Sequence, residues 1–357
     1  MVKRFIPVKM ENLLPAAEQA IRSCLRQVPF ATVNSIEGQP GTSEQGPELL
    51  VRLSLPDKEQ TLAVEVKNNG QPRIARQVAS QLQRYLASRR EDYGVFLAPF
   101  ISSGAAEICT KEGIGFIDLA GNCRLSFDGV YVERQGNPNP FSEKRLLRSL
   151  FGPKSTRVLR VLLSAPGKYW KFKELSKEAR VSLGQVSNVK KLLLDREWIR
   201  EGPRGLALVE PELLLVEWAQ NYDFRKNQST DFYSLESVSD IESELARVCC
   251  ERNLVYALTG FSGAARLAPM VRYQRVSAFV EDMNDDLLAA LNCKPVSSGA
   301  NVSLLAPYDD GVFYGSRSVD GIEIASPIQL YLDLYGVRGR GEEAANAILE
   351  QEIRPLW

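Results

Sequence analysis

Apolar positions along the first 138 residues switch between a helical and a strand-like spacing. The helical spacing predicts helices over residues 11–27, 74–89 and 103–112. The shorter apolar runs predict strands over residues 49–55, 61–66, 93–100, 116–119, 124–127 and 130–133. Residues 56–59 are short enough to close a hairpin, and the Gly-, Pro- and Ser-rich residues 37–47 predict a loop. This order predicts a mixed sheet with helices packed on it.

Beyond the first 138 residues, the apolar spacing predicts short amphipathic helices that are followed by a hairpin. Residues 154–166 and 171–179 predict two helices. Ser182 and Gln185 have the spacing of a capping box, which fixes the start of a third helix. The apolar set of that helix is Val186, Val189, Leu193 and Trp198. The segment that follows Trp198 predicts a β-hairpin, so this part of the chain has the order of a winged helix-turn-helix.

Two polar stretches divide the chain into three expected domains. Residues 135–143 are rich in Pro, Gly and Asn, and the apolar pattern breaks again within residues 222–235. A chain of 357 residues also exceeds the roughly 250–300 residues that a single core supports. The expected domains are residues 1–138, 144–222 and 235–357. The last of these mixes helices and strands, so the expected class is a multidomain α+β protein.

Composition places the chain among soluble proteins and removes several chemistries. The chain is 44% apolar and 25% charged, without an apolar run of membrane-spanning length or the apolar core of a signal peptide. We therefore expect a cytoplasmic protein. Its six cysteines show no CxxC spacing. The absence of histidine excludes Ser-His-Asp and Cys-His nucleophiles, so a general base has to be a carboxylate, a lysine, a tyrosine or a metal-bound water.

Charge is zero overall but is unevenly spread along the chain. Residues 141–230 hold 18 Lys or Arg against 10 Asp or Glu, whereas residues 231–357 hold 10 against 19. A basic middle suits a polyanion, and an acidic end does not. We therefore expect double-stranded DNA to bind the middle domain.

Two carboxylates and a lysine form a candidate catalytic cluster in the first domain. Glu65 and Lys67 are two apart on an expected strand, so they share one face of the sheet. Pairing of the hairpin strands is expected to bring Glu48 close to Glu65, and two carboxylates with open water positions suit Mg²⁺. Gln81 and Tyr85 share a helix face that can turn toward the same site. The alternative is an exposed strand face held by ion pairs.

This cluster resembles the PD-(D/E)xK phosphodiesterase superfamily, and the Gln81/Tyr85 pair resembles its RecB-type branch. The resemblance implies a restriction-endonuclease-like α/β domain. It also implies Glu48 and Glu65 as ligands of Mg²⁺ or Mn²⁺, Lys67 as the family's lysine, and Gln81 and Tyr85 as supporting residues. Glu48 stands where the family usually has aspartate. The histidine of some RecB-type sites is absent, and the sequence leaves open whether Glu11 or Glu18 replaces it.

The third expected helix of the middle domain carries the candidate DNA-reading residues. Short polar side chains suit base edges and lysines suit phosphates. The candidates on this helix are Gln185, Ser187, Asn188, Lys190 and Lys191. Arg204 lies at the tip of the expected hairpin, where it can enter a minor groove. The alternative is a protein-docking module with a solvated basic face.

Two segments of the acidic domain are similar to a known antitoxin family. They are LTGFSGAARLAP (residues 258–269) and SPIQLYLDLYGVRGRGEEA (residues 326–344). They resemble the C-terminal part of AbiEi-family antitoxins of type IV toxin–antitoxin systems, and the resemblance covers about residues 145–357. It implies a winged helix that represses its own promoter and a C-terminal α/β domain that counteracts a nucleotidyltransferase-like toxin. The Gly/Ser turn at Thr259 also resembles the phosphate loop of nucleotidyltransferases, but we expect a tight structural turn there.

Three functions are therefore open at this point. The first is a sequence-specific DNA-binding transcriptional regulator, with a role as an antitoxin. The second is a Mg²⁺-dependent DNA nuclease that its winged helix targets, and the third is a module that binds a toxin protein. We expect no membrane partner, and we expect a homodimer because such regulators usually match two half-sites.

Overall fold

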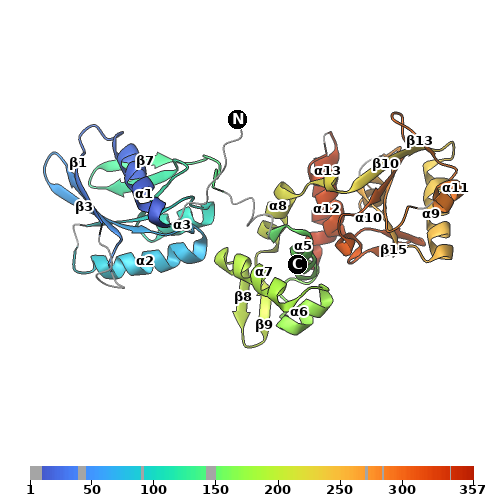
Figure 1. Cartoon of the computed structure of the whole chain (residues 1–357), viewed down its shortest axis with the longest axis horizontal. Coiled ribbons are helices and arrows are strands. Elements are labelled where there is room, and N and C mark those ends of the chain that lie inside the picture. Colours follow the sequence, from blue (N-terminus) through green and yellow to red (C-terminus); the bar gives the residue numbers. More distant parts are fainter. Residues whose placement is uncertain are drawn as a thin grey trace. The chain divides into compact units, whose positions relative to one another are not determined.

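The structure is a computed structural model that describes residues 10–38, 46–89, 92–141, 150–269, 272–283, 285–337 and 339–357. The protein mixes helices and strands in several sheets, which confirms the expected α+β class. The chain forms two compact units: residues 1–146 with residues 194–197, and residues 147–193 with residues 198–357. Their elements are labelled in Figure 1. In the described ranges, no helix is both long and apolar enough to cross a lipid bilayer.

A mixed sheet forms the centre of the first unit. Among the described residues, its strands follow the order of the chain from β1 at one edge to β7 at the other. The strands are β1 (Thr32–Gly38), β2 (Leu49–Ser54), β3 (Glu59–Val66), β4 (Tyr93–Ala98), β5 (Gly115–Asp118), β6 (Cys123–Phe127) and β7 (Val130–Arg134). The pairs β3–β4 and β4–β5 are parallel, and the flanking pairs are antiparallel. Each parallel pair requires a crossover, which the helices after β3 and β4 supply.

Different helices cover the two apolar faces of this sheet (Figure 1). α1 (Met10–Leu25) packs on one face, against alternate residues of β2 and β3. α2 (Pro72–Leu86) and α3 (Ser103–Lys111) pack on the other face. Ser102 caps α3, because its side-chain oxygen accepts a hydrogen bond from the N–H of Ala105 at 3.3 Å. The face under α2 and α3 is the one that also carries Glu65.

The hydrophobic pattern did not predict β1. All of its residues are exposed or half-buried, so the strand has no alternation of apolar and polar residues that would reveal it. The other expected helices and strands of this unit are confirmed to within three residues at their ends. The expected loop over residues 37–47 begins inside β1, and its residues 39–45 lie outside the described residues.

The second unit begins with three helices and a hairpin, in the order that the sequence predicts. We call residues 150–221 the helix–hairpin module. Its helices are α5 (Pro153–Ser164), α6 (Phe172–Glu178), α7 (Leu183–Asp195) and α8 (Pro211–Asn221). Between α7 and α8, β8 (Ile199–Gly202) and β9 (Gly205–Leu208) pair antiparallel. Trp170 adds an isolated antiparallel bridge to Leu206, which fixes the hairpin to the segment before α6.

The rest of the second unit is built on another mixed sheet. Within the described ranges its strand order is β13-β10-β14-β12-β11-β16-β15. The strands are β10 (Gln228–Tyr233), β11 (Tyr256–Leu258), β12 (Val276–Val280), β13 (Lys294–Pro295), β14 (Val302–Ala306), β15 (Arg317–Val319) and β16 (Ile322–Ile324). The pairs β12–β14 and β11–β16 are parallel, and the other pairs are antiparallel. We call residues 228–357 the C-terminal domain.

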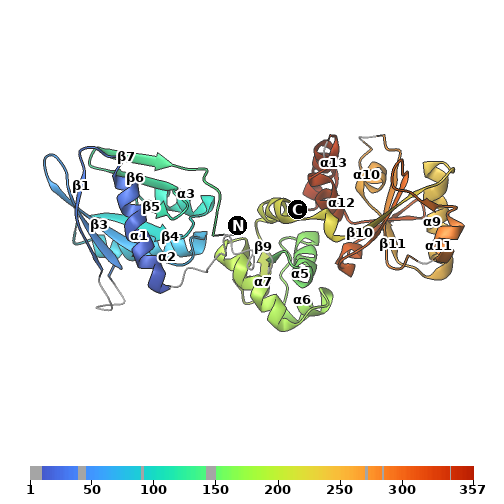
Figure 2. The same cartoon turned by 45° about the horizontal axis from the view of Figure 1, so that its top comes forward.

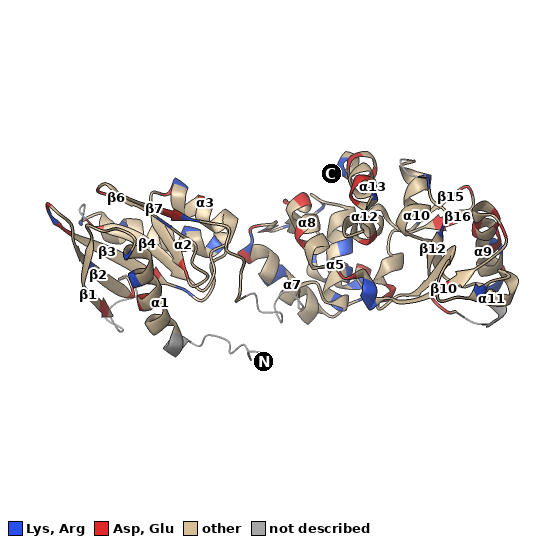
Figure 3. Cartoon of the chain, turned by 90° about the horizontal axis from the view of Figure 1, so that it is seen from above, with Lys and Arg blue, Asp and Glu red and all other residues tan. Residues whose placement is uncertain are grey.

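Helices lie on both sides of this second sheet (Figure 2). They are α9 (Val238–Arg252), α10 (Gly260–Leu267), α11 (Asp285–Ala290), α12 (Pro327–Tyr335) and α13 (Gly341–Ile348). α9 and α11 close one apolar core, whereas α12 packs against α10 and α13. Acidic positions gather on α9 and at the start of α13 (Figure 3). Part of the negative charge that the sequence showed in this part of the chain is therefore carried on these two helices.

The helix–hairpin module and the C-terminal domain form one compact unit, because polar contacts join them. Arg157 of α5 forms a bidentate ion pair with Asp309, with N–O distances of 2.8 and 2.9 Å. Arg160, which is 2% exposed, donates from Nη2 to Oε1 of Gln329 on α12 at 2.6 Å. An arginine within an amphipathic helix is usually a surface residue. The sequence pattern therefore did not indicate that α5 packs on the domain beyond residue 222.

Candidate functional site

α7 presents a polar face above a buried apolar one. Its Val186, Val189 and Leu193 are each at most 1% exposed, as the sequence pattern predicts. Ser187 and Asn188 are exposed on the other side of the helix. Lys191 is also exposed, one turn further along. Three of the predicted reading residues therefore lie on the surface of the protein.

Two other predicted reading residues of α7 have partners inside the protein. Gln185 donates from Nε2 to the Oγ of Ser155 on α5 at 2.7 Å. Lys190 lies 3.0 Å from a carboxylate oxygen of Glu201 on β8. The expected capping box is half formed, because the N–H of Gln185 donates to Oγ of Ser182 at 3.2 Å while its amide turns to α5. These two side chains hold α7 against α5 and β8.

The predicted arginine lies at the tip of the hairpin that follows α7. Arg204 is exposed at the tip, and its guanidinium carbon lies 4.3 Å from the ring centre of Tyr169. Gly205 has a φ of +122°, and a Cβ at this position would lie 2.2 Å from the carbonyl oxygen of Trp170. The hairpin therefore needs glycine there to approach the Trp170 strand segment so closely. This contact holds the tip end of the hairpin beside Arg204, which stays on the surface.

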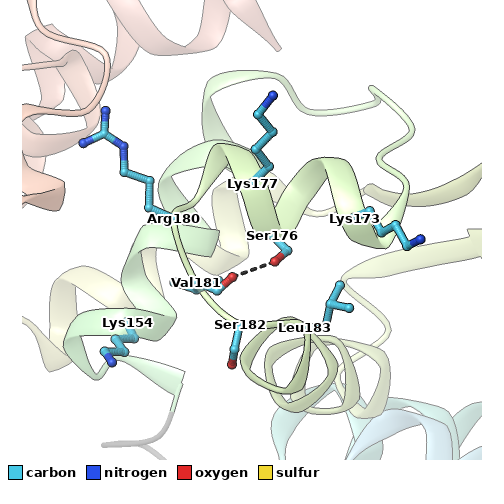
Figure 4. Close-up of a pocket in the computed structure, with 8 residues that line it drawn as sticks. All are labelled: Lys154, Lys173, Ser176, Lys177, Arg180, Val181, Ser182 and Leu183. Atoms are coloured by element: carbon cyan, nitrogen blue, oxygen red, sulfur yellow. Dashed lines mark hydrogen bonds between the residues drawn. The ribbon is translucent and has the colours of Figure 1, made fainter.

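A basic groove beside the start of α7 was not predicted as a site. It has a volume of about 540 Å³ and is lined by Lys154, Lys173, Ser176, Lys177, Arg180, Val181, Ser182 and Leu183 (Figure 4). We call this set the basic groove. The sequence did hold a signal, since Lys173 and Lys177 are four apart and share a face of α6. Two lysines at that spacing are also common on solvated helix faces, so the spacing alone does not indicate a site.

The cluster in the first unit comes together as the hairpin pairing predicts. Leu49 of β2 is paired with Val64 of β3, so Glu48 is one step further on, opposite Glu65. Lys67 Nζ lies 2.8 Å from Oε1 of Glu48 and 2.5 Å from Oε1 of Glu65. Glu65 is only 1% exposed, whereas Glu48 and Lys67 are half-buried. One cation therefore lies between two carboxylates at the end of a buried strand.

The two glutamates of this cluster differ in their affinity for a proton. Burial and the neighbouring Glu48 carboxyl raise the pKa of Glu65 to about 7, against the opposing effect of Lys67. Burial also disfavours the charge of Glu48, but hydrogen bonds from Glu65, Lys67 and the N–H of Val66 hold its pKa below the usual range. Burial opposes the charge of Lys67 as well, yet the two carboxylates raise its pKa. Near neutral pH, Glu48 and Lys67 are charged and Glu65 is close to its midpoint.

The cluster fits a divalent cation in its donor chemistry. Mg²⁺ binds through one or two carboxylates and keeps several waters. Both side-chain oxygens of Glu65 are buried; Oε1 is in the ion pair with Lys67, and Oε2 has no hydrogen-bond partner among the described residues. Within the described ranges, no group of three or more His, Cys, Asp or Glu side chains is placed to hold a metal. A metal held here would therefore rely on Glu48, Glu65 and water.

The two predicted supporting residues on α2 have different surroundings. Gln81 donates from Nε2 to the carbonyl oxygen of Gly46 at 3.5 Å, so it reaches the backbone just before Glu48. The ring of Tyr85 lies under the guanidinium of Arg89, 4.2 Å from its carbon atom. Glu18 is half-buried on α1, and the side chain of Glu11 lies outside the described residues. Of the pair on α2, the structure brings Gln81 toward the cluster and shows Tyr85 in a cation–π contact.

A buried polar network lies where α5 meets the C-terminal domain. Asp333 accepts from Oγ1 of Thr259 at 2.5 Å, from the hydroxyl of Tyr222 at 2.6 Å and from Nε2 of Gln329 at 2.7 Å. Gln329 in turn accepts from Arg160. Thr259 and Asp333 belong to the two sequence segments that resemble the antitoxin family, so these segments meet in space. We call Arg160, Tyr222, Thr259, Gln329 and Asp333 the buried network.

The turn at Thr259 is a structural element of this network. Thr259 and Ser262 are fully buried. The hydroxyl of Ser262 donates to the carbonyl oxygen of Thr259 at 2.9 Å and accepts from the N–H of Ser277 at 3.0 Å. Both hydroxyls of the turn are therefore used inside the protein. This arrangement agrees with the expected tight turn.

The buried network predicts a specific pH dependence of stability. Burial raises the pKa of Asp333 to about 6, although three hydrogen bonds and Arg160 oppose the shift. A raised folded-state pKa means that the folded protein holds the proton longer than the unfolded chain, so stability falls as pH rises toward 6. Relative to Asp333→Asn, the unfolding free energy of the wild type should fall by about 2 kcal/mol between pH 4.5 and 6.5. Urea unfolding of both proteins across that range measures this, and parallel pH profiles would contradict it.

Comparisons with known proteins find a family-model match to part of the chain. No curated protein matches the sequence. Among solved structures, "Structure of EndoMS in apo form" is 20% identical with a TM-score of 0.22, over 33% of this chain and 47% of that one. "Structure of EndoMS-dsDNA2 complex" is 19% identical with a TM-score of 0.19, over 29% and 44%. The chain thus spans less than half the length of either. Residues 207–354, however, match the family described as "Transcriptional regulator, AbiEi antitoxin, Type IV TA system".

Proposed function

We propose that the protein is a sequence-specific transcriptional regulator that binds double-stranded DNA. The observation that carries the proposal is the exposed polar face of α7, with Ser187, Asn188 and Lys191 outward and the apolar face buried. The family match over residues 207–354 supports regulation of transcription as the purpose of that binding. In this proposal the helix–hairpin module acts as a winged helix, with α7 in the major groove.

Each exposed side chain has a distinct proposed task. The amide of Asn188 can bind both N6 and N7 of adenine, and the hydroxyl of Ser187 suits several base edges. Lys191 suits a phosphate, and Arg204 at the hairpin tip suits a phosphate or the minor groove. Gln185 and Lys190 read bases only if they leave Ser155 and Glu201, which costs the contacts they now make. We therefore assign specificity first to Ser187 and Asn188.

Selection from a library of random duplexes tests this proposal. The full chain should enrich one sequence motif, and Asn188→Ala should enrich a motif that has lost information at an adenine position. Two-fold symmetry in the motif would support two copies of the chain on two half-sites, which sedimentation of the complex can check. Recovery of unbiased sequences by both proteins would contradict sequence-specific binding.

The family match motivates a further part of the proposal, which is a role as the antitoxin of a type IV toxin–antitoxin pair. In this role the C-terminal domain, with its acidic helices, counteracts a toxin protein, and the chain acts in the cytoplasm. Co-expression tests the role directly. The full chain should restore growth to cells that produce the cognate toxin, and a growth arrest that the chain does not relieve would contradict it.

A second candidate function is a metal-dependent DNA nuclease, and the convergence of Glu48, Glu65 and Lys67 favours it. We propose the two glutamates as ligands of Mg²⁺ or Mn²⁺, which when bound polarises a phosphate and acidifies a water. Lys67 stays protonated and donates to a phosphate oxygen as negative charge develops there. Gln81 holds the backbone before Glu48 in place.

Incubation of the full chain with labelled single- and double-stranded DNA tests this second candidate. Cleavage should require Mg²⁺ or Mn²⁺, and both Lys67→Ala and Glu65→Gln should abolish it. Lys58→Ala is a matched control, because Lys58 pairs with Asp128 on the surface of the same unit. Bound but intact DNA in every condition would leave the first unit without a nuclease role and would leave the regulator proposal standing.

A further inference from the structure

The turn between α6 and α7 is closed by an unusual residue. Arg180 has a φ of +51°, in the left-handed region that favours glycine. The N–H of Val181 donates to the carbonyl oxygen of Ser176 at 3.0 Å, and the N–H of Arg180 donates to that of Lys177 at 3.2 Å. These two bonds define a Schellman motif at the end of α6, with Arg180 at the position where glycine is most common. The hydroxyl of Ser176 also donates to the carbonyl oxygen of Val181 at 2.6 Å.

An arginine at this position is not explained by the fold of the turn. Its backbone would be less strained as glycine, since a side chain with a Cβ disfavours the left-handed region. The turn itself is held by the backbone bonds and by Ser176, none of which involves the guanidinium. The arginine side chain therefore has a role other than stabilising the turn.

Arg180 lines the basic groove, together with Lys154, Lys173 and Lys177. Within the described part of the chain, no carboxylate forms an ion pair with any of these four cations. The two glutamates of α6 form hydrogen bonds with other partners: Glu174 accepts from the N–H of Lys171 at 3.4 Å, and Glu178 accepts from the hydroxyl of Tyr314 at 2.9 Å. The groove therefore keeps its positive charge for a ligand.

The arrangement of the four cations favours an extended polyanion. Figure 4 shows their charged ends spread around the groove and pointing in different directions, so they do not converge on one point. A single small anion would leave most of them unpaired. A nucleic-acid strand carries a charge at every nucleotide, and it can meet each cation in turn. Ser182 and Leu183 line the groove and also begin α7, so the strand would be next to the helix that reads bases.

We propose that the basic groove binds the phosphodiester backbone of DNA, through Arg180, Lys173, Lys177 and Lys154, beside the segment that α7 reads. The proposal rests on the proposed DNA-binding function and adds a set of contacts apart from the α7 face and Arg204. Backbone contacts carry affinity and position, whereas base contacts carry specificity. The groove should therefore contribute equally to the affinity for every duplex, whatever its sequence.

Three variants of the full chain separate these roles. They are Arg180→Gly, the double variant Lys173→Ala/Lys177→Ala, and Asn188→Ala. Kd is measured as a function of salt for the selected duplex and for a scrambled duplex, with thermal unfolding of each protein alongside. Lys294→Ala is the control, because Lys294 is an exposed lysine on β13 of the C-terminal domain.

Arg180→Gly should weaken binding of both duplexes by roughly three- to tenfold and lower the salt slope by about one, with unchanged specificity. Its Tm should be equal to or above that of the wild type, because glycine relieves the left-handed backbone. The double lysine variant should lower the slope by about two. Asn188→Ala should instead reduce the preference for the selected duplex and keep the slope.

The outcomes distinguish the groove from the proposed function. Unchanged affinity and slope in both groove variants, with a weakened Asn188→Ala, would overturn the groove proposal and leave the regulator standing. Equal binding of both duplexes by all proteins, with lower slopes in the groove variants, would support the groove and contradict sequence-specific reading. Groove variants that lose binding to an acidic protein partner, and not to DNA, would also overturn the proposal.

Discussion

Replacement of Arg160 by alanine is expected to lower the unfolding free energy of the second unit by about 3–5 kcal/mol. Arg160 is 2% exposed, and burial lowers the pKa of its guanidinium. It donates to Gln329, and its guanidinium carbon lies 5.0 Å from the ring centre of Trp218. Alanine would leave a cavity and would remove the cation nearest to the buried Asp333. Guanidinium-induced unfolding of both proteins measures the loss.

Two control proteins make this expectation specific. Arg225→Ala removes an arginine whose side chain is 90% exposed, and it should change the stability by less than about 0.5 kcal/mol. Arg160→Met combined with Asp333→Asn fills the space and removes the buried charge, so it should recover much of the loss. A loss below about 1 kcal/mol in Arg160→Ala would show that the buried network does not hold α5 to the C-terminal domain.

The second large effect is expected on DNA binding. Lys191→Glu should lower the affinity for every duplex by about 2–3 kcal/mol, because it removes a cation from the α7 face and places a negative charge against phosphates. Lys191 is exposed, so the change should leave the fold intact. Titration with a fluorescent duplex at fixed salt measures the effect.

Lys294→Glu is the matched control for this charge reversal, since it changes the net charge equally on an exposed strand of the C-terminal domain. It should alter the affinity only slightly at physiological salt, where distant charges are screened. Equal losses in the two variants would mean that net charge, and not the α7 face, governs DNA binding.

Much of the candidate site could be predicted from the sequence, because short-range patterns determine it. β2 alternates between buried and more exposed residues, and the short connector over residues 56–59 limits how β3 can pair with it, so Glu48 is expected close to Glu65. The apolar spacing of α7 fixes which side is buried, so the exposure of Ser187 and Asn188 follows. In both cases one buried face decides the direction of every other side chain.

Features that depend on contacts distant in sequence were not predicted. The partner of Gln185 is Ser155 on another helix, and no local pattern pairs the two. Arginine usually lies on the surface, but Arg160 is buried. Its partner Gln329 lies far beyond it in the chain, so no local pattern indicated this burial. The left-handed φ of Arg180 was also not predicted, because glycine or asparagine is the residue that usually indicates this conformation. Edge strand β1 was missed because it lacks a buried face.

The ratio of two dissociation constants tests the central claim most directly. The full chain is titrated with the duplex that selection yields and with a scrambled duplex of the same composition, at one fixed salt concentration. The account predicts that the wild type prefers the selected duplex by at least about a thousandfold, and that Asn188→Ala reduces the preference by about 1–3 kcal/mol. A wild-type ratio near one, unchanged in Asn188→Ala, would contradict the claim that α7 reads DNA sequence.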